Sequence, residues 1–167
     1  MNKKVAFFIA FEGFRDEEYL EPKNILESNG IKVVTVSTKK GRAKGKFDTM
    51  VDVDLTVNEI NPEEYSMLVL IGGPKALEYL DKPEIHRIFS KFYQEGKTVA
   101  AICISPVILA HAGILKGKKA TVWPDGKDKL IKAGAIYREE DVVVDSNIIT
   151  ANGPASARKF GNTLLEF

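Results

Sequence analysis

Cysteine and histidine are both scarce in this chain of 167 residues, which contains one cysteine, Cys103, and two histidines, His86 and His111. A single cysteine cannot form an intrachain disulfide, so the class of small secreted domains held together by disulfides is excluded. No segment of signal-peptide type precedes the first predicted strand. We therefore expect a cytoplasmic protein.

Long apolar runs, a surplus of charge and the glycine-rich phosphate motifs are missing as well. No apolar run approaches the length that crosses a membrane, and the formal net charge is +1. This charge balance gives no reason to expect a nucleic acid or an anionic membrane as a partner. Neither G-x-G-x-x-G nor G-x-x-x-x-G-K occurs. We expect neither a cofactor nor a metal.

The chain does contain a regular alternation of strand and helix patterns. Buried strands are predicted at residues 5–10, 31–37, 67–71 and 98–102, and helices at 16–29, 83–95 and 127–133. Residues 50–57 and 119–122 read as further strands, residues 142–144 and 148–150 as a hairpin, and residues 154–167 as a last helix. This alternation predicts an α/β fold with a single domain over 1–167, a flavodoxin-like, doubly wound and mainly parallel sheet.

Cys103 occupies the position in this pattern where open α/β sheets bind ligands. It follows the strand 98–102, and Ser105-Pro106 then begins a helix, with Ser105 as the predicted N-cap. By residue type alone a lone buried cysteine is more often inert, but a nucleophile elbow between a strand and a helix N-terminus favours thiolate. We expect Cys103 to be reactive, with a depressed pKa.

Two other segments contain unusual residues. The helix 16–29 starts with Asp16, Glu17 and Glu18, and Pro22 deprives the carbonyl of Glu18 of its helical hydrogen bond. Gly72-Gly73 directly follows the strand 67–71, and such a turn can present backbone N–H groups as an oxyanion hole.

These segments resemble the ThiJ/PfpI superfamily, which contains PfpI-type intracellular proteases and the parkinsonism-associated protein deglycase. The spacing of Glu18 and Pro22 is most similar to the deglycase branch. The other matching motifs are Ile71-Gly72-Gly73-Pro74, Ala101-Ile102-Cys103-Ile104-Ser105-Pro106, Leu109–Gly117, Thr121-Val122-Trp123-Pro124 and Ile149–Pro154.

The resemblance implies a role for each site residue. Cys103 would be the nucleophile, and Glu18 the carboxyl group that hydrogen-bonds to its sulfur and acts as its proton partner. Gly72, Gly73 and Ile104 would form the backbone oxyanion site, and Trp123 would lie in the substrate pocket.

The chain departs from the family pattern where a histidine is expected. PfpI-type proteases have a histidine directly after the nucleophile, where this chain has Ile104, and the deglycase branch has one near the position of Trp123. We interpret His111 as structural and His86 as a helix-surface residue, so a Cys–His–acid triad is not expected. Without an imidazole to protonate the leaving amine, peptide hydrolysis is disfavoured.

The favoured function is that of a cysteine-dependent stress-response enzyme acting on small reactive carbonyls, with glyoxalase or deglycase chemistry or a related cysteine hydrolase activity. One alternative is a redox sensor or chaperone-like protein that uses oxidation of Cys103, and the other is a PfpI-type peptidase. The expected partners are a small carbonyl substrate or an oxidant, and, by the resemblance, further copies of the chain in a homodimer or larger homo-oligomer.

Overall fold

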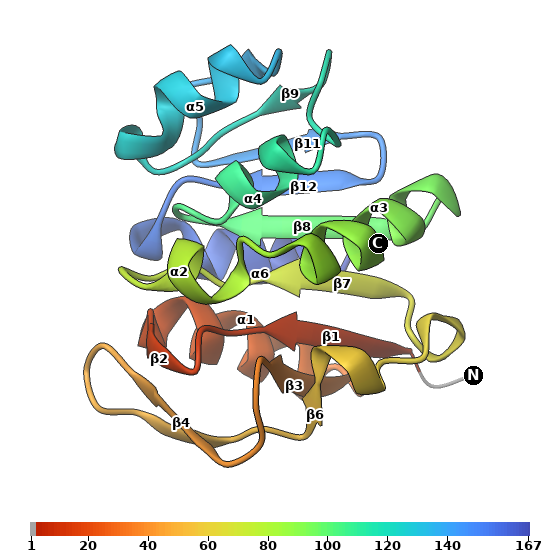
Figure 1. Cartoon of the computed structure of the whole chain (residues 1–167), viewed down its shortest axis with the longest axis vertical. Coiled ribbons are helices and arrows are strands. Elements are labelled where there is room, and N and C mark those ends of the chain that lie inside the picture. The colour runs from red at the N-terminus through yellow and green to blue at the C-terminus, as the bar shows by residue number, and fades with distance from the viewer. Residues whose placement is uncertain (1–2) are drawn as a thin grey trace.

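The computed structural model describes residues 3–167, and it contains a central seven-stranded sheet between two layers of helices (Figure 1). The order of the strands across this sheet is β11-β12-β8-β7-β1-β3-β6. The strands are β1 (Lys4–Phe8), β3 (Lys32–Ser37), β6 (Leu55–Thr56), β7 (Met67–Leu70), β8 (Thr98–Ile102), β11 (Val142–Asp145) and β12 (Ile148–Ala151).

The sheet confirms the predicted fold class. All its neighbouring strands are parallel except β11 and β12, which pair antiparallel as the predicted hairpin. The five strands β1, β3, β7, β8 and β12 follow the flavodoxin-like order 2-1-3-4-5, with β6 and β11 added at the edges. Because both faces are covered, the central strands β7 and β8 are buried along their whole length and consist mostly of apolar residues, which is why the sequence predicted them.

The two helical layers take alternate side chains of the same strands. One face packs against α1 (Asp16–Ser28) and α6 (Ala157–Leu164). The other packs against α3 (Pro83–Gln94) and α4 (Pro106–His111), with α2 (Ala76–Leu80) and α5 (Lys127–Lys132) at its margin. In β8, for example, Ala100 and Ile102 face the first layer while Val99 and Ala101 face the second.

Two small sheets lie outside the central one. One consists of β2 (Glu12–Phe14), β4 (Arg42–Gly45) and β5 (Met50–Asp52), and the other of β9 (Lys119–Ala120) and β10 (Ile136–Tyr137). The 3-10 turns are η1 (Val57–Glu59), η2 (Pro62–Glu64), η3 (Pro124–Gly126) and η4 (Pro154–Ser156).

The strand predicted over 50–57 is divided between two sheets. Its first half is β5, which pairs with β4, and its second half is β6, which joins the central sheet beside β3. The division falls at Asp54, whose carboxylate accepts the backbone N–H of Thr35 at 2.8 Å. Asp54, one of the acidic residues in this alternation, therefore supplies a side-chain acceptor where a strand would supply a backbone carbonyl. The alternation does not reflect one continuous strand.

The segment 119–122 also differs from its prediction. Only Lys119–Ala120 is a strand, and it pairs with β10 in a separate sheet. The next backbone N–H, that of Thr121, donates to the side-chain hydroxyl of Thr150 at 3.0 Å, so it does not donate to the backbone of a neighbouring strand.

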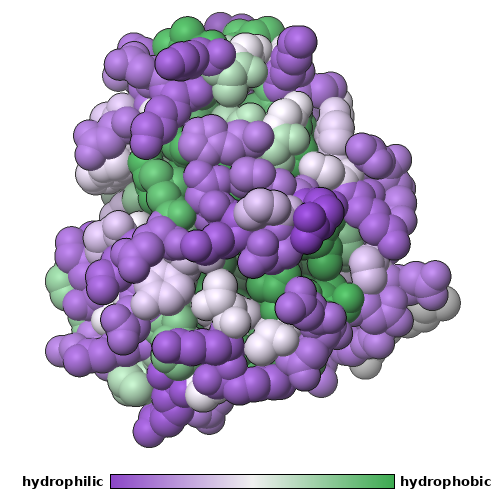
Figure 2. All heavy atoms as spheres, in the orientation of Figure 1, coloured by the Kyte–Doolittle hydropathy of each residue, from purple (hydrophilic) through white to green (hydrophobic). Residues whose placement is uncertain are grey.

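The face of the molecule seen in Figure 2 is mostly hydrophilic, with hydrophobic atoms visible in the gaps between polar side chains. Within residues 3–167, no helix is long and apolar enough to cross a membrane.

Candidate active site

Cys103 lies between the end of β8 and the start of α4, with its backbone in the left-handed region at φ 66°. This conformation costs a non-glycine residue about 1–2 kcal/mol, so it needs support from its surroundings. The Cys103 N–H donates to the carbonyl of Ala151 at 2.9 Å, and its carbonyl accepts the N–H of Trp123 at 2.7 Å. The nucleophile elbow predicted after the central strand is therefore present.

Ser105 does not cap α4 in the way the sequence suggested. Its hydroxyl, fully buried, donates to the carbonyl of Ile71 at 2.8 Å, and makes no capping bond to the helix. The serine instead connects the elbow to the end of β7, which is the strand that carries Gly72 and Gly73 on its carboxyl side.

Glu18 projects from α1 to the same point as Cys103. A side-chain carbon placed on Gly72 would lie 2.5 Å from both the Cys103 Cβ and the Glu18 Oε1. Glu18 is fully buried, and neither of its carboxyl oxygens makes a well-aligned hydrogen bond with any residue in the described range. Burial raises the pKa of Glu18 to about 8, against the opposing influence of the nearby Cys103 thiol and the charge of Arg15. Glu18 is therefore protonated at neutral pH.

The expectation of a depressed pKa for Cys103 is wrong. Burial raises the pKa of its thiol, and ionised Glu18 raises it further, while the backbone N–H groups of Ile104 and Gly73 act in the opposite direction. The sequence argument counted the helix terminus and the backbone donors but could not include the desolvation of the sulfur. Cys103 and Glu18 both hold their protons at neutral pH.

Gly72 and Gly73 are both required for this geometry. Gly73 has φ 128°, and a Cβ there would lie 2.6 Å from the backbone nitrogen of Arg15. At Gly72 a Cβ would occupy the space between the cysteine and the glutamate. The absence of side chains lets the turn after β7 approach the start of α1, where the Arg15 N–H donates to the Gly72 carbonyl at 2.9 Å.

A pocket of about 300 Å³ opens at the sulfur of Cys103. Trp123, 41% exposed, lies in its wall together with Ile104. The other residues that line the pocket are Arg15, Lys46, Gly73, Pro74, Leu77, Asp125 and Pro154. Sequence reasoning missed Arg15, Lys46 and Asp125. The signal for Lys46 is the cationic run 39–46, which the sequence alone favours as a solvated hairpin or loop.

Comparisons with known proteins show the family to which the chain belongs. A model of the DJ-1/PfpI family matches residues 3–167. The chain belongs to the DJ-1/PfpI family. Deglycase PH1704 of Pyrococcus horikoshii is 41% identical over 154 residues, which are 91% of this chain and 91% of that protein.

Two further comparisons cover nearly the whole chain. Protein MJ0967 of Methanocaldococcus jannaschii is 48% identical over 168 residues, 99% of this chain and 82% of that protein. The crystal structure of a ThiJ/PfpI domain protein from Brachyspira murdochii superposes with a TM-score of 0.96 and 32% sequence identity, over 99% of this chain and 96% of the other.

The pocket of this DJ-1/PfpI protein has no imidazole in its wall. Both histidines bind the carboxylate of Asp81, His86 through Nε2 and His111 through Nδ1, each at 2.6 Å. The structural interpretation of His111 agrees with this contact. His86 is half-buried and paired, so it is more than the helix-surface residue we expected.

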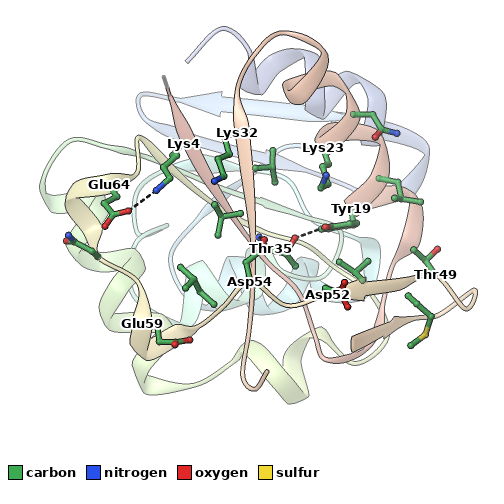
Figure 3. Close-up of a pocket in the computed structure, with 18 residues that line it drawn as sticks. Lys4, Tyr19, Lys23, Lys32, Thr35, Thr49, Asp52, Asp54, Glu59 and Glu64 are labelled. Carbon is green, nitrogen blue, oxygen red and sulfur yellow. Dashed lines mark hydrogen bonds and ion pairs between the residues drawn. The ribbon is translucent and has the colours of Figure 1, made fainter. Parts of the chain in front are cut away.

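A second hollow of this DJ-1/PfpI protein is larger, about 790 Å³, and lies between α1, β3 and the segment 49–64 (Figure 3). Two pairs of its polar side chains bind each other, Lys4 and Glu64 in an ion pair at 2.8 Å and Tyr19 and Thr35 in a hydrogen bond at 2.6 Å. No cysteine or histidine lines it. Size alone therefore does not make it the reactive site.

The described part of the chain brings no three histidine, cysteine, aspartate or glutamate side chains together as metal ligands.

Proposed function

We propose that this protein is a cysteine-dependent enzyme that converts small 2-oxoaldehydes into 2-hydroxy acids, with Cys103 as nucleophile and Glu18 as proton partner. The observation that carries the proposal is the fully buried Glu18, protonated at neutral pH, beside Cys103 in a pocket without an imidazole. A single carboxyl group suffices for this chemistry because the substrate is isomerised and no amine has to leave.

The first step adds Cys103 to the aldehyde carbon. A carbon–sulfur bond forms, the π pair of the carbonyl moves to its oxygen, and that oxygen receives the proton of Glu18 while the thiol proton passes to the carboxylate. The product is a neutral hemithioacetal, so neither group has to be ionised beforehand. The N–H groups of Gly73 and Ile104, which lie near the sulfur, would stabilise the developing oxyanion.

The second step is an internal oxidation and reduction. Glu18, which the first step leaves protonated, gives its proton to the ketone oxygen and, as the resulting carboxylate, takes the hydrogen of the former aldehyde carbon as a proton, which leaves an enediol. Glu18 then returns this proton to the former ketone carbon and takes the proton of the hydroxyl group on the former aldehyde carbon. The aldehyde carbon is thereby oxidised to a thioester and the ketone reduced to an alcohol. Water hydrolyses the thioester, releases the 2-hydroxy acid and restores the thiol, so no external oxidant or reductant is required.

The relatives support this chemistry, because a protein named deglycase is 41% identical over 91% of the chain. The test is turnover of methylglyoxal, followed as formation of lactate. We expect slow turnover by the wild type, loss of turnover in Cys103→Ser, and a loss of about a hundredfold or more in Glu18→Gln. Glu21→Gln, an exposed carboxyl on the same helix, is the matched control. Wild-type activity at background would overturn the proposal.

A redox sensor is the second candidate, and the same buried carboxyl group favours it. Peroxide would convert the Cys103 thiol to a sulfenic acid with release of water, and a second equivalent would give the sulfinic acid. Protonated Glu18 could donate to one of the new oxygens. If the sensor is the function, intact-mass measurement over a peroxide titration will show oxidation that stops at the sulfinic acid, in a protein that does not turn over methylglyoxal.

A further inference from the structure

Two cations and one carboxylate lie at the wall of the Cys103 pocket: Arg15, Lys46 and Asp125. The rest of the wall is largely apolar, with Leu77, Ile104 and Trp123 among its members. Basic groups on a protein surface are usually only solvated, but Arg15 and Lys46 both lie against the ring of Phe47.

Arg15 is fixed at both its backbone and its side chain. Its N–H donates to the Gly72 carbonyl, its Nε donates to Glu17 at 2.6 Å, and its guanidinium lies over the Phe47 ring with 4.8 Å to the centroid. A guanidinium has five N–H groups, and Glu17 uses only those on Nε and one terminal nitrogen. The remaining donors have no partner within residues 3–167. The side chain is ordered and still able to bind an anion.

Lys46 reaches the pocket because a hairpin turn is held over the start of α1. The carboxylate of Asp16, buried, accepts the N–H of Phe47 at 2.8 Å and that of Thr49 at 3.0 Å. The N–H of Lys46 donates to the Phe14 carbonyl at 2.8 Å. The Lys46 ammonium lies 5.4 Å from the Phe47 ring, so this 56% exposed aromatic side chain contacts both cations.

We propose that Arg15 and Lys46 form a carboxylate-binding subsite beside Cys103, and that the substrates are 2-oxoaldehydes that carry a carboxylate. A guanidinium presents parallel donors that match the two oxygens of a carboxylate, and an ammonium adds a second point of attachment. The apolar wall then accommodates the carbon chain between the carboxylate and the reacting aldehyde. The carboxylate of Asp125 repels an anion and so limits its affinity. Removal of this charge should therefore strengthen anion binding, the opposite of the effect of removing Arg15 or Lys46. This inference rests on the proposed function for the reaction, but the subsite can be tested without turnover.

The binding test uses two alkylating reagents of nearly the same size, the anion iodoacetate and the neutral iodoacetamide. The measured quantity is the ratio of their rates at Cys103, because effects on the thiol itself cancel. Relative to a small free thiol, we expect the ratio to be raised in the wild type and to fall about tenfold in Arg15→Gln and severalfold in Lys46→Gln. Asp125→Asn raises it, and salt reduces it. Arg42→Gln, an exposed cation of the same hairpin, is the control.

The substrate test compares 4,5-dioxopentanoate with methylglyoxal, which share the same dicarbonyl group. We expect kcat/KM to favour the carboxylate-bearing substrate at least tenfold, and Arg15→Gln to remove most of that preference. If neither compound is turned over while the alkylation ratio behaves as expected, the reaction is wrong and the subsite stands. An alkylation ratio equal to that of a free thiol, and unchanged by Arg15→Gln and Lys46→Gln, overturns the inference.

Discussion

At the scale of single residues, the thiol of Cys103 and the carboxyl group of Glu18 lie next to each other inside the fold. Cys103 and Glu18 border the same point beside Gly72, and burial raises the pKa of both. Because a charge on either group disfavours a charge on the other, the pair loses its second proton at a higher pH than its first. In the proposed reaction Glu18 would therefore carry a proton, and it would not activate the thiol before the substrate binds.

Replacing Glu18 with glutamine should therefore lower the pKa of Cys103, because the carboxylate that opposes the thiolate is removed. The measurement is the rate of alkylation by iodoacetamide between pH 6 and 11. Each unit of lowered pKa gives about tenfold more thiolate at a given pH below it. The same variant should lose turnover of methylglyoxal, so a more reactive thiol would coincide with a less active enzyme.

The control for this profile is Glu21→Gln, which should leave it unchanged because Glu21 lies one turn further along the helix and is exposed. A higher pKa of Cys103 in Glu18→Gln would contradict the argument. It would show that Glu18 donates its proton to the thiolate and lowers the pKa of Cys103 in the wild type.

Many residues of this site could be predicted from sequence motifs, and the properties that could not be predicted have a physical cause. The motifs correctly placed Cys103 on an elbow and Gly72-Gly73 at the end of the neighbouring strand. Two more of the predicted residues lie close by, Glu18 beside Gly72 and Cys103, and Trp123 in the wall of the pocket. Their chemical roles stay predictions. Burial, which reverses the expected pKa of Cys103, depends on the packing of several elements and leaves no local trace in the sequence.

At the scale of elements, the carboxylate of Asp81 connects three helices. It follows α2, and it binds His86 of α3 and His111 of α4 with one oxygen each. Because α4 begins just after Cys103, this contact also holds the helix that follows the elbow.

Asp81→Asn should destabilise the fold by about 1–2 kcal/mol, because an amide can accept only one of the two hydrogen bonds with its oxygen. Urea unfolding at constant pH measures the change in free energy. The double variant Asp81→Asn, His86→Ala should cost less than the sum of the two single variants, because the residues are in contact. Additive costs would mean that the contact between Asp81 and His86 contributes nothing to stability.

The elements also show which parts of the structure cannot be predicted from sequence patterns. The parallel strands were predicted because runs such as Met67–Leu70 are apolar throughout. The position of the hairpin turn over the pocket was not predicted, since it depends on hydrogen bonds from Phe47 and Thr49 to Asp16, more than thirty residues away in the chain. Lys46 was therefore interpreted as solvated although it reaches the site.

At the scale of the whole molecule, the expected homo-oligomer stays a prediction.

The buried acids Asp16 and Glu18 make the free energy of unfolding depend on pH, because folding shifts their pKa values in opposite directions. The pKa of Asp16 is lowered. Its burial raises the pKa, but the hydrogen bonds from Thr49 and Phe47 outweigh burial and lower it. Stability from Asp16 is thus present at neutral pH and is lost as the pH falls through its folded pKa.

Glu18 acts in the opposite direction, because its pKa rises from 4.5 in the unfolded chain to about 8 in the folded protein. Between these values the folded state binds more protons, so its stability is complete below pH 4.5 and falls as the pH rises to about 8. The loss is on the order of 5 kcal/mol at most, since each pKa unit corresponds to about 1.4 kcal/mol. Urea unfolding at intervals from pH 5 to 8 should show this decline in the wild type and in Glu21→Gln, and a much flatter profile in Glu18→Gln. A decline of equal slope in Glu18→Gln would mean that the protonated carboxyl group of Glu18 is not its source, and that Glu18 is ionised in the folded protein.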